Sequence, residues 1–205
     1  MTDEPTHDAG GFAAWLVEIQ GAIRDERPAE VPCGECTACC RSSQFVHIAP
    51  DEQDALRHIP RELLFPAPRL PRGHVLMGYD EHGRCPMLGQ QGCTIYDHRP
   101  RTCRTYDCRI FPATGTAPAD DGKTAIADRA ARWRFQHPGE DDRVLHDAVR
   151  AASAYLRDHA DQLGAGSVPT TATQRAVLAI EIHDLFTHNE PPSAHDVQVA
   201  ITNRR

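Results

Sequence analysis

The sequence is poor in lysine, in aromatic residues and in long apolar runs. Lys123 is the single lysine among 22 basic residues, and 29 acidic residues give a formal net charge of −7. Aromatic residues make up 6% of the chain. General nucleic-acid binders use a cationic surface, often with aromatic rings on which bases stack. Because both features are missing, we expect no nucleic-acid partner.

No stretch approaches the roughly 18 apolar residues of a membrane span. The first ten residues, MTDEPTHDAG, are polar and acidic and lack the apolar core of a signal peptide. These features predict no membrane partner and a cytoplasmic location. In a reducing compartment, thiols bind metal or carry out redox chemistry more often than they form disulfides.

The cysteines are concentrated in one part of the chain. The first four form the pattern C-x2-C-x2-C-C, in which successive thiols can turn toward one centre. A thiolate metal site needs about four soft ligands, so such a local group is normally completed by ligands distant in sequence. The remaining four cysteines supply them. We therefore predict that the metal-binding residues are Cys33, Cys36, Cys39, Cys40, Cys85, Cys93, Cys103 and Cys108.

The identity of the metal stays open at this point between zinc and iron. Cys85 is followed by Pro86, and three cysteines at two-residue gaps with a remote Cys-Pro pair are typical of bacterial ferredoxins, which favours an iron–sulfur cluster. Zinc also binds four thiolates, and eight cysteines could form two such sites. A single cluster with spare thiols fits as well.

The sequence favours a metal-binding protein with a structural or accessory role over an enzyme. It contains no GxSxG, HExxH or glycine-rich phosphate-binding motif. The alternative is an iron–sulfur redox enzyme or a subunit of a protein-modifying enzyme, because the cysteines exceed the needs of one four-ligand site.

Two segments carry a family resemblance: CGECTACC, and CPMLGQQGCTIYDHRPRTCR. They resemble the CxxCxxCC putative zinc- or iron-chelating domain, also called the YkgJ-type cysteine-cluster family, over about residues 33 to 111. The resemblance implies a metal-binding role for the seven cysteines from Cys33 to Cys103. Cys108 enters the predicted set through the clustering of the cysteines.

Charged residues near the cysteines can complete or compensate the site. Four arginines, Arg99, Arg101, Arg104 and Arg109, surround Cys103 and Cys108. A four-thiolate site carries about two negative charges, so we expect at least one guanidinium group to face it. If fewer than four thiolates converge, neutral imidazole is the next ligand, and the candidates are His47, His82 and His98.

The hydrophobic pattern predicts an α+β fold, mostly α, in which amphipathic helices pack with a small cysteine-rich, metal-centred region of short strands. Ser193 and Asp196 have the spacing of a capping box that opens a last helix. Helices are expected at about 10–25, 51–58, 124–135, 145–159 and 172–188, with a short one around Cys103. Short strands are expected at 44–48, 74–79, 84–88, where 84–88 pairs with 74–79, and 94–96. Residues 60–71 are expected to form a proline-rich loop.

We predict three parts from these patterns. Residues 1–32 form an N-terminal helix and extension, residues 33–111 a cysteine-cluster metal-binding domain, and residues 112–205 a helical C-terminal segment.

Overall fold

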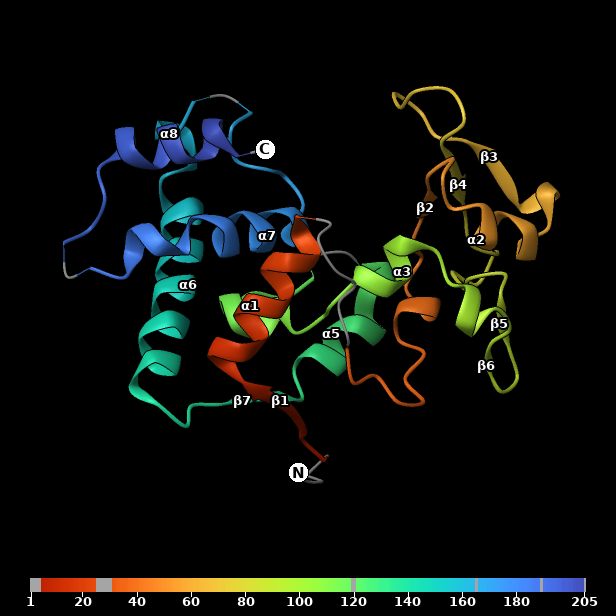
Figure 1. Cartoon of the computed structure of the whole chain (residues 1–205), viewed down its shortest axis with the longest axis horizontal. Coiled ribbons are helices and arrows are strands. Elements are labelled where there is room, and N and C mark those ends of the chain that lie inside the picture. Colours follow the sequence, from red (N-terminus) through yellow and green to blue (C-terminus); the bar gives the residue numbers. More distant parts are fainter. Residues whose placement is uncertain (1–4, 25–30, 119–120, 165, 189, 205) are drawn as a thin grey trace. The chain divides into compact units, whose positions relative to one another are not determined.

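The computed structural model describes residues 5–24, 31–118, 121–164, 166–188 and 190–204. Helices dominate and the sheets are small, which confirms the predicted α+β, mostly α, class (Figure 1). The chain divides into two compact units. The first consists of Met1–Arg27, Cys108–Ala119 and Ala127–Arg205, and the second of Pro28–Asp107 and Asp120–Ile126. Each unit therefore contains segments that are separate in the sequence.

The first unit combines a parallel pair of strands with helices. Strand β1 (His7–Gly11) pairs in parallel with β7 (Trp133–Gln136), so that His7 lies opposite Trp133. The helices of this unit are α1 (Phe12–Ile23), α4 (Ile110–Thr114), α6 (Glu140–Asp158), α7 (Ala172–Ile182) and α8 (Ala194–Asn203), with 3-10 turns at Ala160–Gln162 and His183–Phe186.

The core of the first unit lies between its longer helices. Helix α6 contacts both α1 and α7, and α7 lies across α6 in Figure 1. Residues four apart on one helix face the same neighbour, as Leu178 and Ile182 do on α7. The buried cluster consists of Ala152, Leu156, Leu163, Leu178, Ala179, Ile182, Val197 and Ile201.

The helix boundaries test the sequence predictions. The predicted helix 10–25 is observed as α1, and its predicted last residue, 25, lies outside the described residues. The capping box that opens α8 is confirmed, because the Asp196 amide donates to Ser193 Oγ over 3.2 Å. Helix α6 starts earlier than predicted, at Glu140, because Asp142 accepts a hydrogen bond of 3.0 Å from the Gly139 amide.

The predicted helix 124–135 is wrong at its end. Helix α5 (Thr124–Ala130) ends before Trp133, and Trp133–Gln136 form β7. Along β7 the exposed fraction alternates: Trp133 is buried, Arg134 exposed, Phe135 half-buried and Gln136 exposed. This alternation is the two-residue period of a strand, and the partner strand β1, far away in the sequence, stabilises it.

The second unit contains an antiparallel sheet in the order β2 (Val46–Ile48), β4 (Val75–Met77) and β3 (Leu64–Pro66). A hairpin of β5 (Leu88–Gly89) and β6 (Gly92–Cys93) follows. Helices α2 (Gln53–His58) and α3 (Arg101–Thr105) and 3-10 turns at Cys39–Arg41, Arg61–Leu63, Tyr96–His98 and Asp121–Lys123 complete the elements.

Two strand predictions for this unit are wrong. Residues 84–88 do not pair with 74–79, because both edges of β4 are occupied by β2 and β3. Strand β3 comes from the predicted proline-rich loop, and Pro66 is tolerated there because β3 is an edge strand. The predicted strand 94–96 is not formed, because β6 ends at Cys93, which pairs with Leu88, and the chain then turns into the 3-10 turn Tyr96–His98.

The apolar core of the second unit lies directly against thiols. Its buried members are Val46, Ile48, Ala55, Ile59, Met77, Met87 and Ile95. Cys85, Cys93 and Cys103 are partly buried and pack against this cluster. The cysteine side chains therefore have an apolar wall on one side.

His146 of the first unit occupies an environment that opposes its protonation. Its ring stacks on Phe12 with centroids 4.1 Å apart, and its Nδ1 lies 2.8 Å from Nε2 of His137. Burial lowers the pKa of His146 to about 4, and the positive charges of Arg150 and His137 act in the same direction. The folded protein therefore holds this ring neutral.

This environment predicts a loss of stability in acid. As pH falls from about 6.5 to about 4, the unfolded chain protonates His146 before the folded chain does, so the free energy of unfolding decreases through this window. His146→Phe keeps a ring against Phe12 and should reduce the decrease in urea unfolding curves measured at pH 7, 5.5 and 4. The exposed His195→Gln is the control. Identical pH dependence in wild type and His146→Phe would contradict the prediction.

Candidate metal centre

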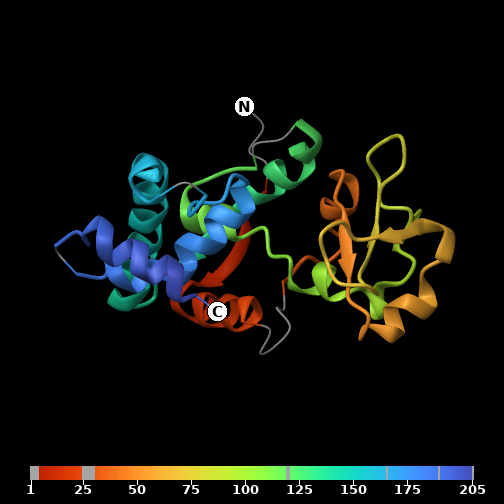
Figure 2. The ribbon, with the colours of Figure 1, turned by 90° about the horizontal axis from the view of Figure 1, so that it is seen from above.

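Seven of the eight cysteines line one cavity of about 690 Å³ in the second unit. They come from the segment before β2, from the β5–β6 region and from α3. Figure 2 shows the second unit from above, with its ribbon running from orange to green. The cysteines that line the cavity are Cys33, Cys36, Cys39, Cys40, Cys85, Cys93 and Cys103.

The first four cysteines lie on a tight turn followed by a 3-10 helix. The Cys36 amide donates to the Cys33 carbonyl over 3.0 Å. Gly34 between them has φ of +54°, a left-handed conformation that glycine adopts at little cost. The next two cysteines, Cys39 and Cys40, begin the 3-10 helix Cys39–Arg41. The spacing C-x2-C-x2-C-C therefore folds these thiols back toward the cavity.

Backbone hydrogen bonds join this turn to the second group of cysteines. The Cys85 amide donates to the Cys40 carbonyl over 2.8 Å, which brings two distant parts of the chain together. The Thr94 amide donates to the Met87 carbonyl over 2.9 Å and holds the segment that carries Cys93 beside the one that carries Cys85.

Two of the sulfurs accept hydrogen bonds from the backbone two residues further on. The Met87 amide donates to the Cys85 sulfur, and the Ile95 amide donates to the Cys93 sulfur. Such bonds stabilise the thiolate form and lower its pKa. Hydrogen bonds of this kind orient the sulfur ligands of metal sites and adjust how strongly they bind the metal.

Helix α3 places Cys103 in the cavity and is fixed by Glu52. One carboxylate oxygen of Glu52 accepts from the Arg101 amide at the start of α3, and the other accepts from the Ala49 amide over 2.8 Å. Thr102 Oγ1 also donates to the carbonyl of a β2 residue over 2.7 Å. No spacing in the sequence points to Glu52, because its partner Arg101 lies 49 positions away.

Four sulfurs influence one another electrostatically: those of Cys40, Cys85, Cys93 and Cys103. The Cys40 thiol donates to Cys85, which raises the pKa of Cys40 and lowers the pKa of Cys85 to about 7. Burial, with the nearby Cys85 and Cys93, raises the pKa of Cys103 to about 12, and burial also raises the pKa of Cys93. Four thiolates cannot gather here without a compensating cation, and a donor set of this kind fits zinc or iron.

Arg99 is the guanidinium group that acts on these thiols. It lines the cavity, and its charge lowers the pKa of both Cys93 and Cys103, against the larger effect of burial. Its Cζ lies 3.6 Å from the centroid of the Tyr96 ring, and its Nε donates to the Tyr96 carbonyl over 2.7 Å. The prediction that at least one arginine faces the thiols is therefore confirmed.

The other three arginines of the predicted group have different surroundings. Arg101 pairs with Asp51 over 2.8 Å, and Arg104 is exposed. Arg109 is buried in the first unit and donates to the Ala9 carbonyl over 3.1 Å.

Cys108 belongs to the first unit and is not among the described residues that line the cavity. It is buried, and its sulfur accepts a hydrogen bond of 3.2 Å from Nε1 of Trp133. Its place in the predicted metal-binding set stays a prediction.

The three histidines considered as ligands are not among the described residues that line the cavity. His47 contacts His74, with 2.9 Å between ring nitrogens. His82 lies 3.6 Å from a Glu81 oxygen, and His98 lies 2.7 Å from Asp54 Oδ2.

Comparison with known proteins identifies the region around this cavity. Residues 32–129 match the family model described as CxxCxxCC: putative zinc- or iron-chelating domain. The match confirms the resemblance drawn from the cysteine motifs and extends it beyond residue 111. No curated protein and no solved structure matches the chain. Within the described residues, no helix has both the length and the apolar character needed to cross a membrane.

The pKa values predict unequal reactivity of the thiols in metal-free protein. The hydrogen bond from Cys40 favours the thiolate form of Cys85, whereas burial favours the protonated form of Cys103, so iodoacetamide should alkylate Cys85 at least about tenfold faster. The rate at Cys85 should rise as pH increases through about 7. Pulsed alkylation followed by peptide mass spectrometry measures both sites, with unfolded protein as the control. Equal rates at the two sites in folded protein would contradict the prediction.

Proposed function

We propose, from the chelating domain that the chain carries over residues 32–129, that the second unit binds zinc or iron through its cysteines and that the metal stabilises this unit. The gathering of seven cysteines around one cavity is the observation that carries the proposal. In it, the central ligands are Cys40, Cys85, Cys93 and Cys103, whose sulfurs come from three parts of the chain and shift one another's pKa values.

Charge balance supports this choice of ligands. Four thiolates beside an apolar cluster repel one another, and a divalent cation offsets two of the four negative charges. Arg99 lies close enough to Cys93 and Cys103 to offset part of the remainder. The amides of Met87 and Ile95 stabilise the sulfurs further.

A second candidate is an iron–sulfur centre, which the ferredoxin-like spacing of Cys33, Cys36 and Cys39 and the remote Cys85-Pro86 pair favour. All four of these cysteines line the same cavity. Bound there, an iron–sulfur cluster would supply one-electron transfer, and the protein would act as a redox enzyme or as an accessory subunit of a protein-modifying enzyme. Both candidates place the protein in the cytoplasm, where thiols stay reduced.

The kind of metal is tested by anaerobic purification. An absorption band in the visible range, with iron and acid-labile sulfide in the metal analysis, would support the iron–sulfur candidate. Colourless protein that contains zinc would support a structural zinc site. Protein that binds neither zinc nor iron after reconstitution under reducing conditions would contradict the proposal.

Single serine replacements should distinguish the cysteines that bind the metal from those that do not. Cys85→Ser, Cys93→Ser or Cys103→Ser each removes one central thiolate and should lower the bound metal to about half or less, because structural sites are sensitive to the loss of a ligand. Cys108→Ser is the matched control, since Cys108 bonds Trp133 in the first unit. We expect it to keep its metal.

Metal content is measured by elemental mass spectrometry on protein verified to be folded by circular dichroism. Loss of metal in Cys108→Ser would add Cys108 to the ligands, as the sequence pattern predicts. Unchanged metal in all eight serine variants would contradict binding through the cysteines.

Removal of the metal should unfold the second unit selectively. Its strands have two or three residues each, whereas structural zinc contributes about 10 kcal/mol or more in small domains. Hydrogen exchange after complete chelation should become fast in peptides from β2, β4 and α3. Peptides from α6 and α7, whose core contains no cysteine, should keep their protection. Unchanged protection in the second unit would contradict a structural role for the metal.

A further inference from the structure

A second group of metal-ligating side chains lies outside the cysteine cavity. It consists of Asp54 and His58 on α2 and His98 on the 3-10 turn Tyr96–His98. One ligand atom from each residue lies within 4.8 Å of the other two. These residues do not line the cysteine cavity, as far as the structure describes its lining. This group and the cysteines of the cavity are therefore two separate candidate metal sites.

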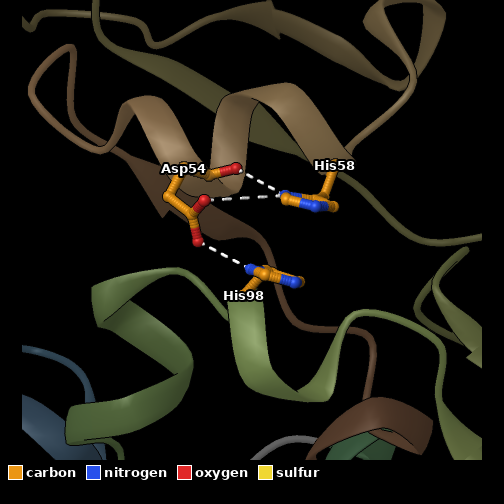
Figure 3. A group of neighbouring side chains, drawn as sticks. All are labelled: Asp54, His58 and His98. Atoms are coloured by element: carbon orange, nitrogen blue, oxygen red, sulfur yellow. Dashed lines mark hydrogen bonds and ion pairs between the residues drawn. The ribbon is translucent and has the colours of Figure 1, made fainter.

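Both imidazole rings turn a nitrogen toward Asp54 (Figure 3). His98 Nδ1 lies 2.7 Å from Asp54 Oδ2, and His58 Nδ1 lies 3.9 Å from Oδ1. The rings are parallel to within 5°, with centroids 3.6 Å apart. The two nitrogens and the carboxylate thus surround one small space between two elements of the second unit.

We propose that Asp54, His58 and His98 bind one divalent transition metal ion of the zinc class, independently of the cysteine centre. Two nitrogens and one carboxylate form a donor set that suits zinc and its neighbours and that is too rich in nitrogen for magnesium or calcium. In this site the ion takes the place of the proton between His98 and Asp54.

The distances are compatible with this site. Ligand atoms lie about 2.0 to 2.2 Å from zinc, so two ligands of one ion are at most about 4.4 Å apart. The nitrogen–oxygen distances of 2.7 and 3.9 Å are within this limit. His58 Nδ1 also lies 2.9 Å from the Asp54 carbonyl oxygen, and this contact is exchanged for the metal. All three side chains are partly exposed, so water can fill the remaining coordination positions.

One neighbouring charge opposes the ion. Arg57 Nη2 lies 3.4 Å from Asp54 Oδ1, and its side chain is 72% exposed. A guanidinium group at this distance competes with a cation for the carboxylate. Removal of the Arg57 charge should therefore tighten zinc binding. If the contact between α2 and the turn were purely structural, the loss of this charge would leave zinc binding unchanged.

Zinc titration of the full chain tests the site. Protein already saturated at its cysteines is titrated with zinc chloride and followed by calorimetry and by imidazole nitrogen resonances. We expect one further zinc ion per chain, with shifted Nδ1 resonances for His58 and His98. Asp54→Asn and His98→Gln keep side-chain size and hydrogen-bonding capacity and should weaken this step at least about tenfold. The control His82→Gln should bind as wild type, and Arg57→Gln should bind more tightly.

The outcomes separate this site from the proposed function. If Asp54→Asn loses the further zinc ion and keeps the metal at the cysteines, both proposals stand. If the cysteines bind no metal but one zinc ion is lost in Asp54→Asn, only the present inference stands. No zinc beyond that at the cysteines, or an unchanged zinc step in both Asp54→Asn and His98→Gln, would overturn it.

Discussion

The second unit depends on the close approach of several cysteine sulfurs to one another. Cys40, Cys85, Cys93 and Cys103 come from three parts of the chain and shift one another's pKa values, while an apolar cluster that includes Met87 and Ile95 packs on one side. In such surroundings thiols stay protonated unless a cation compensates their charge. Protonation and metal binding are therefore alternatives for this site.

Polar groups around the cavity hold this arrangement in place. Glu52 accepts hydrogen bonds from backbone amides of two segments and fixes the start of α3, on which Cys103 lies. Arg99, held against Tyr96, adds a positive charge beside two of the sulfurs. Each contact is modest by itself, but together they set the positions from which thiolates can reach one ion.

The first unit is organised by different forces. Its helices α6, α7 and α8 enclose a continuous apolar cluster without cysteine, and the parallel pair β1 and β7 joins residues near the start of the chain to the distant segment Trp133–Gln136. Cys108 belongs to this unit and bonds the Trp133 indole. Metal chemistry in the second unit and apolar packing in the first can therefore be perturbed separately.

The sequence by itself determined the mostly helical class, helices α1 and α8 and the thiol-rich chelating domain, because helical periodicity, capping residues and C-x2-C-x2-C-C spacing are local signals. Only the tertiary structure decided that β7 is a strand, that Arg99 lines the cavity, and that Cys108 accepts a hydrogen bond from Trp133. The pairing of Asp54 with His98 could likewise not be predicted from the sequence. These features depend on partners distant in sequence, and a side chain's charge and pairing are fixed by its neighbours in space.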